Sequence, residues 1–163
     1  MLIRRAQSSD AEAIASIFNH EVEEGLSNYE SRRHSPLERE EWLERLEKSE
    51  YPVMVAEENE RVLGFAALTP FHPLSGYRFT VTGSIYVDSS TRRAGVGKSL
   101  ATEILKEARI RRYHSILAGV NSENVACLAL LKTFGFEPVG HFREIGWKNG
   151  KWRDDICLQL LLD

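Results

Sequence analysis

The sequence of 163 residues lacks the features that mark several large protein classes. Its formal net charge is −3, so it has no general basic field that would attract nucleic acid. No apolar run approaches the roughly 18 residues that a membrane-spanning helix needs. The two cysteines, Cys127 and Cys157, form no CxxC motif and lie in apolar surroundings. We therefore expect buried, reduced thiols, and neither nucleic acid nor a membrane as a partner.

The sequence also lacks a metal-ligand pattern, a signal peptide, and repeats or linkers. The histidines are not spaced as metal ligands, so no metal is expected. Residues Met1–Arg5 contain no apolar core of the kind found in signal peptides, which predicts a cytoplasmic location. No repeat, low-complexity tract or linker interrupts the chain, and we expect a single domain over residues 1–163.

Capping signals and the helical spacing of apolar residues indicate four helices. The first follows a capping box at Ser9–Glu12 and ends near Gly25, and the second begins at a capping box over Ser35–Glu38. The third begins near Gly97, and the fourth spans Asn124–Phe134. Strands are expected at Leu2–Arg5, Pro52–Glu57, Val62–Leu68, Phe79–Val87, Ser115–Val120, Pro138–Glu144 and Trp152–Leu162. This β-α-α-β-β-β-α-β-α-β-β order predicts an α/β (α+β) fold with a mixed sheet and helices on its faces.

The segment Arg92–Lys98, with the sequence RRAGVGK, lies between the strand that ends at Val87 and the third helix. It does not match the Walker motif, because Arg92 stands where the first glycine is needed. It does not match G-x-G-x-x-G either, because Leu100 stands at the place of the third glycine. These mismatches argue against binding of a nucleoside triphosphate or a dinucleotide.

The same segment has the properties of a site for an anion such as a pyrophosphate. Gly95 and Gly97 allow the backbone to approach a ligand, and the first N–H groups of the following helix point toward the loop. Arg92, Arg93 and Lys98 add positive charge. A solvated turn with no ligand explains these residues too, and the loop alone does not decide between the two interpretations.

Together, the loop and the order of elements resemble the GNAT (GCN5-related) N-acetyltransferase family. Residues Arg92–Gly97 fit its R/Q-x-x-G-x-G/A motif, which in that family binds the pyrophosphate of acetyl-coenzyme A (acetyl-CoA). Asn124, which opens a helix followed by Phe134–Phe136, resembles the family's asparagine that contacts the pantetheine arm. The resemblance implies a GNAT fold, with a mostly antiparallel central sheet, and acetyl-CoA as the co-substrate. The residues that it implies for the cofactor are Ile85, Tyr86, Val87, Arg92, Arg93, Ala94, Gly95, Val96, Gly97, Lys98 and Asn124.

Further segments narrow the resemblance to the phosphinothricin and methionine sulfoximine acetyltransferase subgroup. These segments are Ile3–Ala6, Ile17–His20, Tyr51–Glu57, Ser84–Val87 and Gly146–Asp154. The last is similar to the subgroup's G-x-K-x-G-x-W-x-D motif, and a turn is expected within it at residues 146–151. The resemblance implies direct transfer of acetyl from the thioester to the amine of a small molecule, an amino acid or an analogue of one.

The strand Phe79–Val87 alternates apolar and polar residues, with Thr82, Ser84 and Tyr86 on one face. Gly83 interrupts the apolar face, which suggests a bulge or a close backbone approach, or merely relieves packing. The family carries a bulge in this strand that frees backbone N–H groups for the thioester. By this resemblance, the backbone of residues 85–87 holds the arm of the cofactor.

The sequence departs from the subgroup at its acid–base positions. Thr82 stands where the subgroup has a glutamate that accepts the proton, and Leu131 stands where GNAT enzymes have a histidine or a tyrosine. Leu74 matches a position that often holds arginine. A threonine hydroxyl is no base near neutral pH and leucine has no exchangeable proton, so this acid–base pair does not carry over.

Three explanations for the proton transfer therefore stay open. The acceptor amine loses its proton to water, or another group takes it, with Glu23, Glu30 and His72 as candidates. That transfer is direct or runs through water held by Thr82 and Ser84, the two residues expected at the catalytic position. Alternatively, the chain is a CoA-binding regulatory or interaction module with little or no catalysis. Because positioning of the reactants survives the loss of a base, the enzyme remains the main interpretation.

The resemblance also points to residues around the acceptor and to an assembly. The residues expected to line the acceptor pocket are Tyr29, Glu30, Tyr77 and Arg78. Tyr29 matches an aromatic residue of the family, although each of the four is equally well explained as a half-buried surface residue. Trp147 and Trp152 flank the last turn and pack either across a homodimer, which is usual in the subgroup, or in a local cluster.

Overall fold

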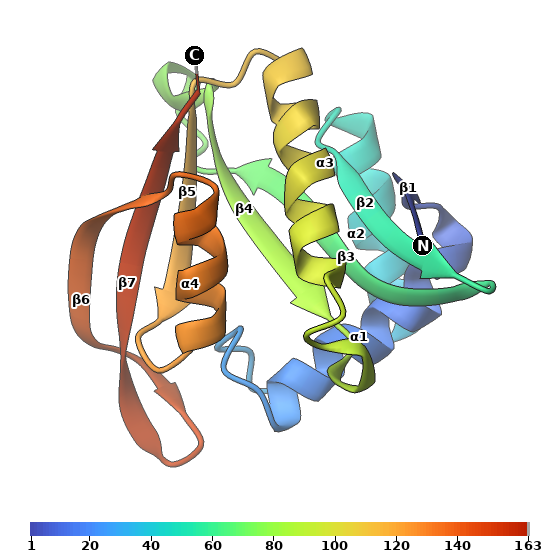
Figure 1. Cartoon of the computed structure of the whole chain (residues 1–163), viewed down its shortest axis with the longest axis horizontal. Coiled ribbons are helices and arrows are strands. Elements are labelled where there is room, and N and C mark those ends of the chain that lie inside the picture. Colours follow the sequence, from blue (N-terminus) through green and yellow to red (C-terminus); the bar gives the residue numbers. More distant parts are fainter. Residues whose placement is uncertain (163) are drawn as a thin grey trace.

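The computed structural model describes residues 1–162, which form a seven-stranded mixed sheet between two layers of helices (Figure 1). The strands are β1 (Leu2–Arg5), β2 (Val53–Glu58), β3 (Arg61–Pro70), β4 (Thr80–Val87), β5 (Ser115–Asn121), β6 (Glu137–Lys148) and β7 (Lys151–Leu161). The helices are α1 (Ala11–Glu23), α2 (Pro36–Lys48), α3 (Val96–Ile110) and α4 (Val125–Thr133). Within these residues the predicted order of helices and strands is confirmed.

The strands lie in the order β1-β2-β3-β4-β5-β7-β6, and the two central strands β4 and β5 pair in parallel. The other neighbours pair antiparallel. One apolar core joins α1 and α2 to β2 and β3, and its buried side chains include Ile14, Phe18, Leu43 and Phe65. The other core lies under α3 and α4. The sheet is therefore covered on both faces, which confirms the predicted mixed sheet with helices on its faces.

The two predicted capping boxes have different outcomes. The Ser35 hydroxyl accepts the Glu38 N–H at 3.1 Å, and the Glu38 carboxylate accepts the Ser35 N–H at 2.7 Å, so α2 begins as predicted. The box at Ser9–Glu12 is wrong, because residues 8–10 form a 3₁₀ turn ahead of α1. Asp10 is buried there by the Arg4 guanidinium, which donates to both carboxylate oxygens at 2.8 and 2.9 Å.

The bulge predicted in the fourth strand is also wrong. Strand β4 keeps an unbroken register with β3, from Val81 opposite Pro70 to Val87 opposite Gly64. The sheet opens differently, because the parallel pairing of β4 and β5 ends at Thr82 opposite Leu117. Beyond that pair the two strands diverge, as Figure 1 shows toward the lower edge. The other interpretation of Gly83, a close approach, fits better, since a Cβ there would lie 3.3 Å from Ile116.

The last hairpin is tighter than predicted. Strands β6 and β7 run to Lys148 and from Lys151, so the turn is only Asn149 and Gly150 rather than residues 146–151. Both turn residues have positive φ, +53° and +74°. An Asn-Gly pair tolerates this conformation and matches the twist of the two strands. The longer strands place Lys148 inside the fold, where its side chain is buried.

Candidate active site

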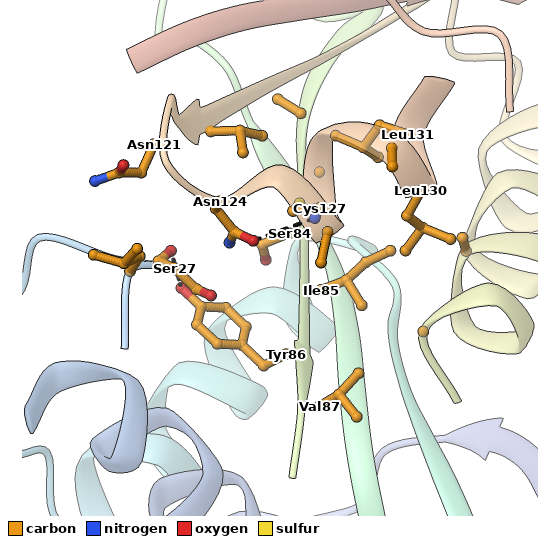
Figure 2. A pocket seen from close by; sticks show the side chains of 18 of the residues that line it. Ser27, Ser84, Ile85, Tyr86, Val87, Asn121, Asn124, Cys127, Leu130 and Leu131 are labelled. Carbon is orange, nitrogen blue, oxygen red and sulfur yellow. Dashed lines mark hydrogen bonds between the residues drawn. The ribbon is translucent and has the colours of Figure 1, made fainter. Parts of the chain in front are cut away.

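A cleft of about 1000 Å³ lies where β4 and β5 part. Its walls come from the second half of β4, the loop before α3, α3 itself, β5, α4, and the last turn of α1 with the residues after it as far as Ser27. Figure 2 shows the hydroxyl of Tyr86 pointing toward Ser27, with Asn124 on the same side, whereas Ile85, Leu130 and Leu131 lie on the other side.

The loop at one end of the cleft has the geometry of an anion site. Gly95 precedes α3 with φ of +83°, and no side chain caps this end of the helix. The N–H groups of the first turn, from Val96 on, have no acceptor within the helix. A Cβ on Gly95 would meet nothing within 4 Å, and residues Gly95–Lys98 line the cleft. The exposed side chains of Arg93 and Lys98 flank the same loop.

Arg92 has a different environment from its two cationic neighbours. Its guanidinium forms an ion pair with Glu21, a residue of α1 that is only 3% exposed. The second oxygen of Glu21 accepts the Ser27 N–H at 3.1 Å. Glu21 therefore links the loop before α3 to the segment that follows α1, and its carboxylate balances the charge of Arg92.

Lys148 also holds the end of α1 and the segment that follows it in place. Its ammonium donates to the Glu21 carbonyl at 2.5 Å and to the Asn28 carbonyl at 2.7 Å. Burial lowers the pKa of Lys148, and the charge of Glu21 opposes that effect. The sequence analysis singled out the segment that contains Lys148 but assigned the lysine no role, and it missed Glu21, because no short-range pattern links residues 71 or more positions apart.

The predicted cofactor residues of β4 and α4 meet in this cleft. Ser84, Ile85, Tyr86 and Val87 all line it, as does Asn124. The Tyr86 ring stacks on Phe65 with centroids 4.9 Å apart, and burial raises the pKa of its hydroxyl to about 12. The side-chain oxygen Oδ1 of Asn124 accepts the Cys127 N–H at 3.2 Å and so caps α4. Its side-chain amide N–H₂ remains for another partner.

The two cysteines are free thiols and are partly rather than fully buried. Cys127 lines the cleft, and burial raises the pKa of its thiol to about 11. Burial also raises the pKa of the Cys157 thiol, and the nearby charge of Asp155 adds to the effect. Both thiols therefore hold their protons near neutral pH, the form in which cysteine is least nucleophilic.

Two of the three positions where the sequence departs from the subgroup lie beside the cleft, and the third, Leu74, is exposed in the connection between β3 and β4. Leu131 is buried and lines the apolar side. Thr82 is half-buried at the last pair between β4 and β5, and its carbonyl accepts the Thr69 hydroxyl at 3.5 Å. The next two residues, Gly83 and Ser84, line the cleft itself. The polar face of β4 thus ends at the opening with hydroxyls and no carboxylate.

The predicted acceptor residues are not gathered in one place. The Tyr29 hydroxyl donates to Asp155 at 2.6 Å and accepts from Asn121 at 3.2 Å. Burial and then the bond to Asp155 raise the pKa of that hydroxyl. Tyr77 is 44% exposed in the connection between β3 and β4, and the Arg78 guanidinium lies 4.3 Å from the centre of the Phe79 ring.

The three predicted bases have other partners or stand outside the cleft. Glu30 pairs with His34 at 2.9 Å, and this hydrogen bond is the main cause that lowers the pKa of the Glu30 carboxyl. Glu23 pairs with Arg33 at 2.7 Å on the surface. His72 is exposed, and its ring accepts the Leu74 N–H at 3.2 Å.

The described part of the chain contains neither a metal-binding cluster nor a membrane-spanning helix. No group of three or more histidine, cysteine, aspartate and glutamate side chains is arranged to hold a metal ion. None of the helices in that range is both long enough and apolar enough to cross a membrane.

Comparison with known proteins gives a consistent result. A family model described as an acetyltransferase (GNAT) domain matches residues 3–157. An L-methionine sulfoximine/L-methionine sulfone acetyltransferase of Salmonella typhimurium is 34% identical over all of this chain and 95% of its own length. The L-amino acid N-acyltransferase MnaT of Escherichia coli is 35% identical over the same shares. The acetyltransferase YncA of Salmonella typhimurium, solved with its cofactor acetyl-CoA, superimposes with a TM-score of 0.98 at 34% identity, covering 100% of this chain and 94% of that one.

Proposed function

Because this chain belongs to the GNAT acetyltransferase family, we propose that it acetylates the amine of a small amino acid or of an amino-acid analogue. It is an acetyl-CoA-dependent N-acetyltransferase. Methionine sulfoximine and phosphinothricin are the first acceptors to test, because relatives of this chain are named as acetyltransferases of these two compounds and of L-amino acids. The observation that carries the proposal is the parting of β4 and β5 beyond Thr82, which joins the anion loop to the polar face of β4.

The residues around the cleft fit acetyl-CoA. In this proposal the free N–H groups of Gly95–Lys98 and the exposed Arg93 and Lys98 hold the pyrophosphate. Arg92, whose charge Glu21 balances, keeps the loop in place. The Asn124 amide and the backbone of Ile85–Val87 hold the pantetheine arm.

The parting of β4 and β5 frees backbone N–H groups that can stabilise negative charge during the reaction. Along a strand, N–H groups point alternately to the two neighbouring strands. After Thr82, those that face β5 have lost their ladder partner, so they are free to stabilise charge on the thioester oxygen. Ser84 stands at this point and orders the acceptor or a water next to it. Acetyl-CoA supplies the activated acyl group, and the chain supplies position and hydrogen bonds.

We further propose that the chain is a cytoplasmic homodimer of one domain, joined through the β6–β7 hairpin. Trp147 and Trp152 form a T-shaped pair with centroids 5.2 Å apart, and each is 57% exposed. Ile145 and Val139 of β6 are exposed as well. Exposed apolar side chains on a hairpin at the edge of the sheet favour a protein partner.

An amine panel tests the proposed function. Purified protein is mixed with acetyl-CoA and each of the twenty amino acids, methionine sulfoximine, methionine sulfone or phosphinothricin, and release of free thiol is followed. Turnover with at least one α-amine is expected. Thermal stabilisation by acetyl-CoA without turnover of any amine in the panel would contradict the proposed acceptor class and favour a CoA-binding module.

A further inference from the structure

Asp155 lies on the face of the sheet from which the proposed acceptor approaches. Residues that are directly paired across two strands point to the same face. Thr82 pairs with Leu117, and two and four residues farther along β5 come Gly119 and Asn121, which pair with Cys157 and Asp155. Asp155 therefore shares a face with Thr82, although 73 residues separate them in the sequence.

The two oxygens of the Asp155 carboxylate have different environments. Oδ1 accepts the Tyr29 hydroxyl at 2.6 Å, and that hydroxyl in turn accepts the Asn121 amide at 3.2 Å. Oδ2 lies over Gly119, where an added Cβ would be 3.6 Å away. Within residues 1–162 no hydrogen-bond donor reaches Oδ2. One oxygen thus fixes the orientation of the carboxylate, and the other is free to meet a ligand.

The free oxygen is level with the opening in the sheet. Gly119 stands two residues beyond the last β4–β5 pair, as Ser84 does on β4, so the two face each other across the gap. Both residues line the cleft. Because Gly119 has no side chain, nothing on β5 separates Oδ2 from the space between the strands.

Three carboxylates line the cleft, and two of them have cationic partners, whereas the third, Glu24, is exposed and lies 4.0 Å from the His20 ring. Glu21 pairs with Arg92, and Glu123 pairs with Lys151 and Arg153. The groups that face Asp155 are Tyr29 from the loop after α1, Asn121 from β5, Phe142 from β6, and Arg153 and Cys157 from β7 itself. Arg153 is committed to Glu123 and to the Lys148 carbonyl. The charge of Asp155 is therefore available to an incoming ammonium group.

We propose that Asp155 is the catalytic carboxylate of this chain, and that its Oδ2 binds the acceptor ammonium and takes a proton from it. It would do so from β7, in place of the glutamate that Thr82 replaces on β4. Oδ2 removes one proton, and the lone pair on nitrogen forms the bond to the acetyl carbon. The carbon–sulfur bond breaks with its electron pair on sulfur, and the second proton lost by nitrogen neutralises that thiolate. Asp155 then returns its own proton to water, which leaves amide and free thiol as products.

The inference rests on the proposed function, and Asp155→Asn tests it separately. The isosteric amide cannot take the proton, so kcat/KM for the best acceptor of the panel should fall about 10²–10⁴-fold. The deficit should shrink by about tenfold per pH unit toward the pKa of the amine, because the variant must use amine that water has already deprotonated. Calorimetry gives a readout besides activity, since the acceptor should bind the CoA-loaded variant more weakly while CoA itself binds unchanged.

Asp154→Asn is the matched control. The neighbouring carboxylate points away, bonding the His141 ring and the Glu144 N–H at 2.8 Å each, so its loss should leave acceptor binding and the pH profile unchanged. If Asp155→Asn does not fold, Gly119→Ala tests the same contact by placing a methyl group over Oδ2, and it should lower acceptor affinity while CoA still binds. The inference would be overturned if the wild type turns over and kcat/KM of the Asp155→Asn variant stays within about threefold of the wild-type value at every pH. A wild type that acetylates no amine would overturn the proposed function and the inference with it.

Discussion

Gly95 is the residue on which the proposed cofactor site depends most. Its φ of +83° is a conformation that a β-branched residue rarely adopts, and an added Cβ would stand in open space at the wall of the cleft. Gly95→Val should therefore abolish or strongly weaken acetyl-CoA binding. The measurement is the calorimetric affinity for CoA.

Gly150→Val separates that effect from backbone strain. Gly150 also has a positive φ, +74°, and also has nothing within 4 Å of an added Cβ, but it lies in the β6–β7 turn. Both variants should lose stability, by about 1–2 kcal/mol or more. Equal CoA affinity in the two variants would mean that the loop does not hold the pyrophosphate.

The sequence predicted residues whose role depends on near neighbours, and it missed those that act through distant ones. The loop 92–98 could be read because its glycines and cations stand together and precede a helix. The pairs Glu21–Arg92 and Tyr29–Asp155 span 71 and 126 residues. No periodicity encodes such a contact, because the sheet order, and not spacing along the chain, brings the partners together.

At the scale of elements, helix α2 begins at the capping box formed by Ser35 and Glu38, and removing the Ser35 hydroxyl disrupts this box. The Ser35 hydroxyl accepts the Glu38 N–H and, with Pro36 in the first turn, starts the helix. Ser35→Ala should lower the free energy of unfolding by about 1 kcal/mol, measured by urea denaturation. Ser31→Ala, at an exposed serine four residues earlier that caps no helix, should change it little. Equal values for the two variants would contradict this account of the helix start.

Local signals predicted elements well where no distant partner competed with them. The Ser35 box was readable for that reason, whereas the Ser9 box failed because Arg4 draws Asp10 into a preceding turn. The parting of β4 and β5 was not predicted as such. It depends on where the pairing of β5 with β4 ends, which no local pattern encodes. The sequence instead suggested a bulge at Gly83, and the structure has none there.

At the scale of the whole molecule, the exposed tryptophans of the β6–β7 hairpin determine the expected assembly. Analytical ultracentrifugation of the wild type should give twice the chain mass of 18.6 kDa. Trp152→Glu places a charge in the proposed interface and should give monomers, because burying an unpaired charge is costly. Leu37→Glu, at a residue of α2 that is 62% exposed, should leave the dimer intact. A wild type that sediments as a monomer would contradict the proposed interface.

The central claim is that the gap between β4 and β5 connects a cofactor site on one face of the sheet to an acceptor site on the other. A crystal structure of the protein with acetyl-CoA tests it most directly. The account predicts the pyrophosphate against the N–H groups of Gly95–Lys98 and the acetyl group between Ser84 and Gly119. An acetyl group that lies outside this gap, or a pyrophosphate held by other residues, would contradict it.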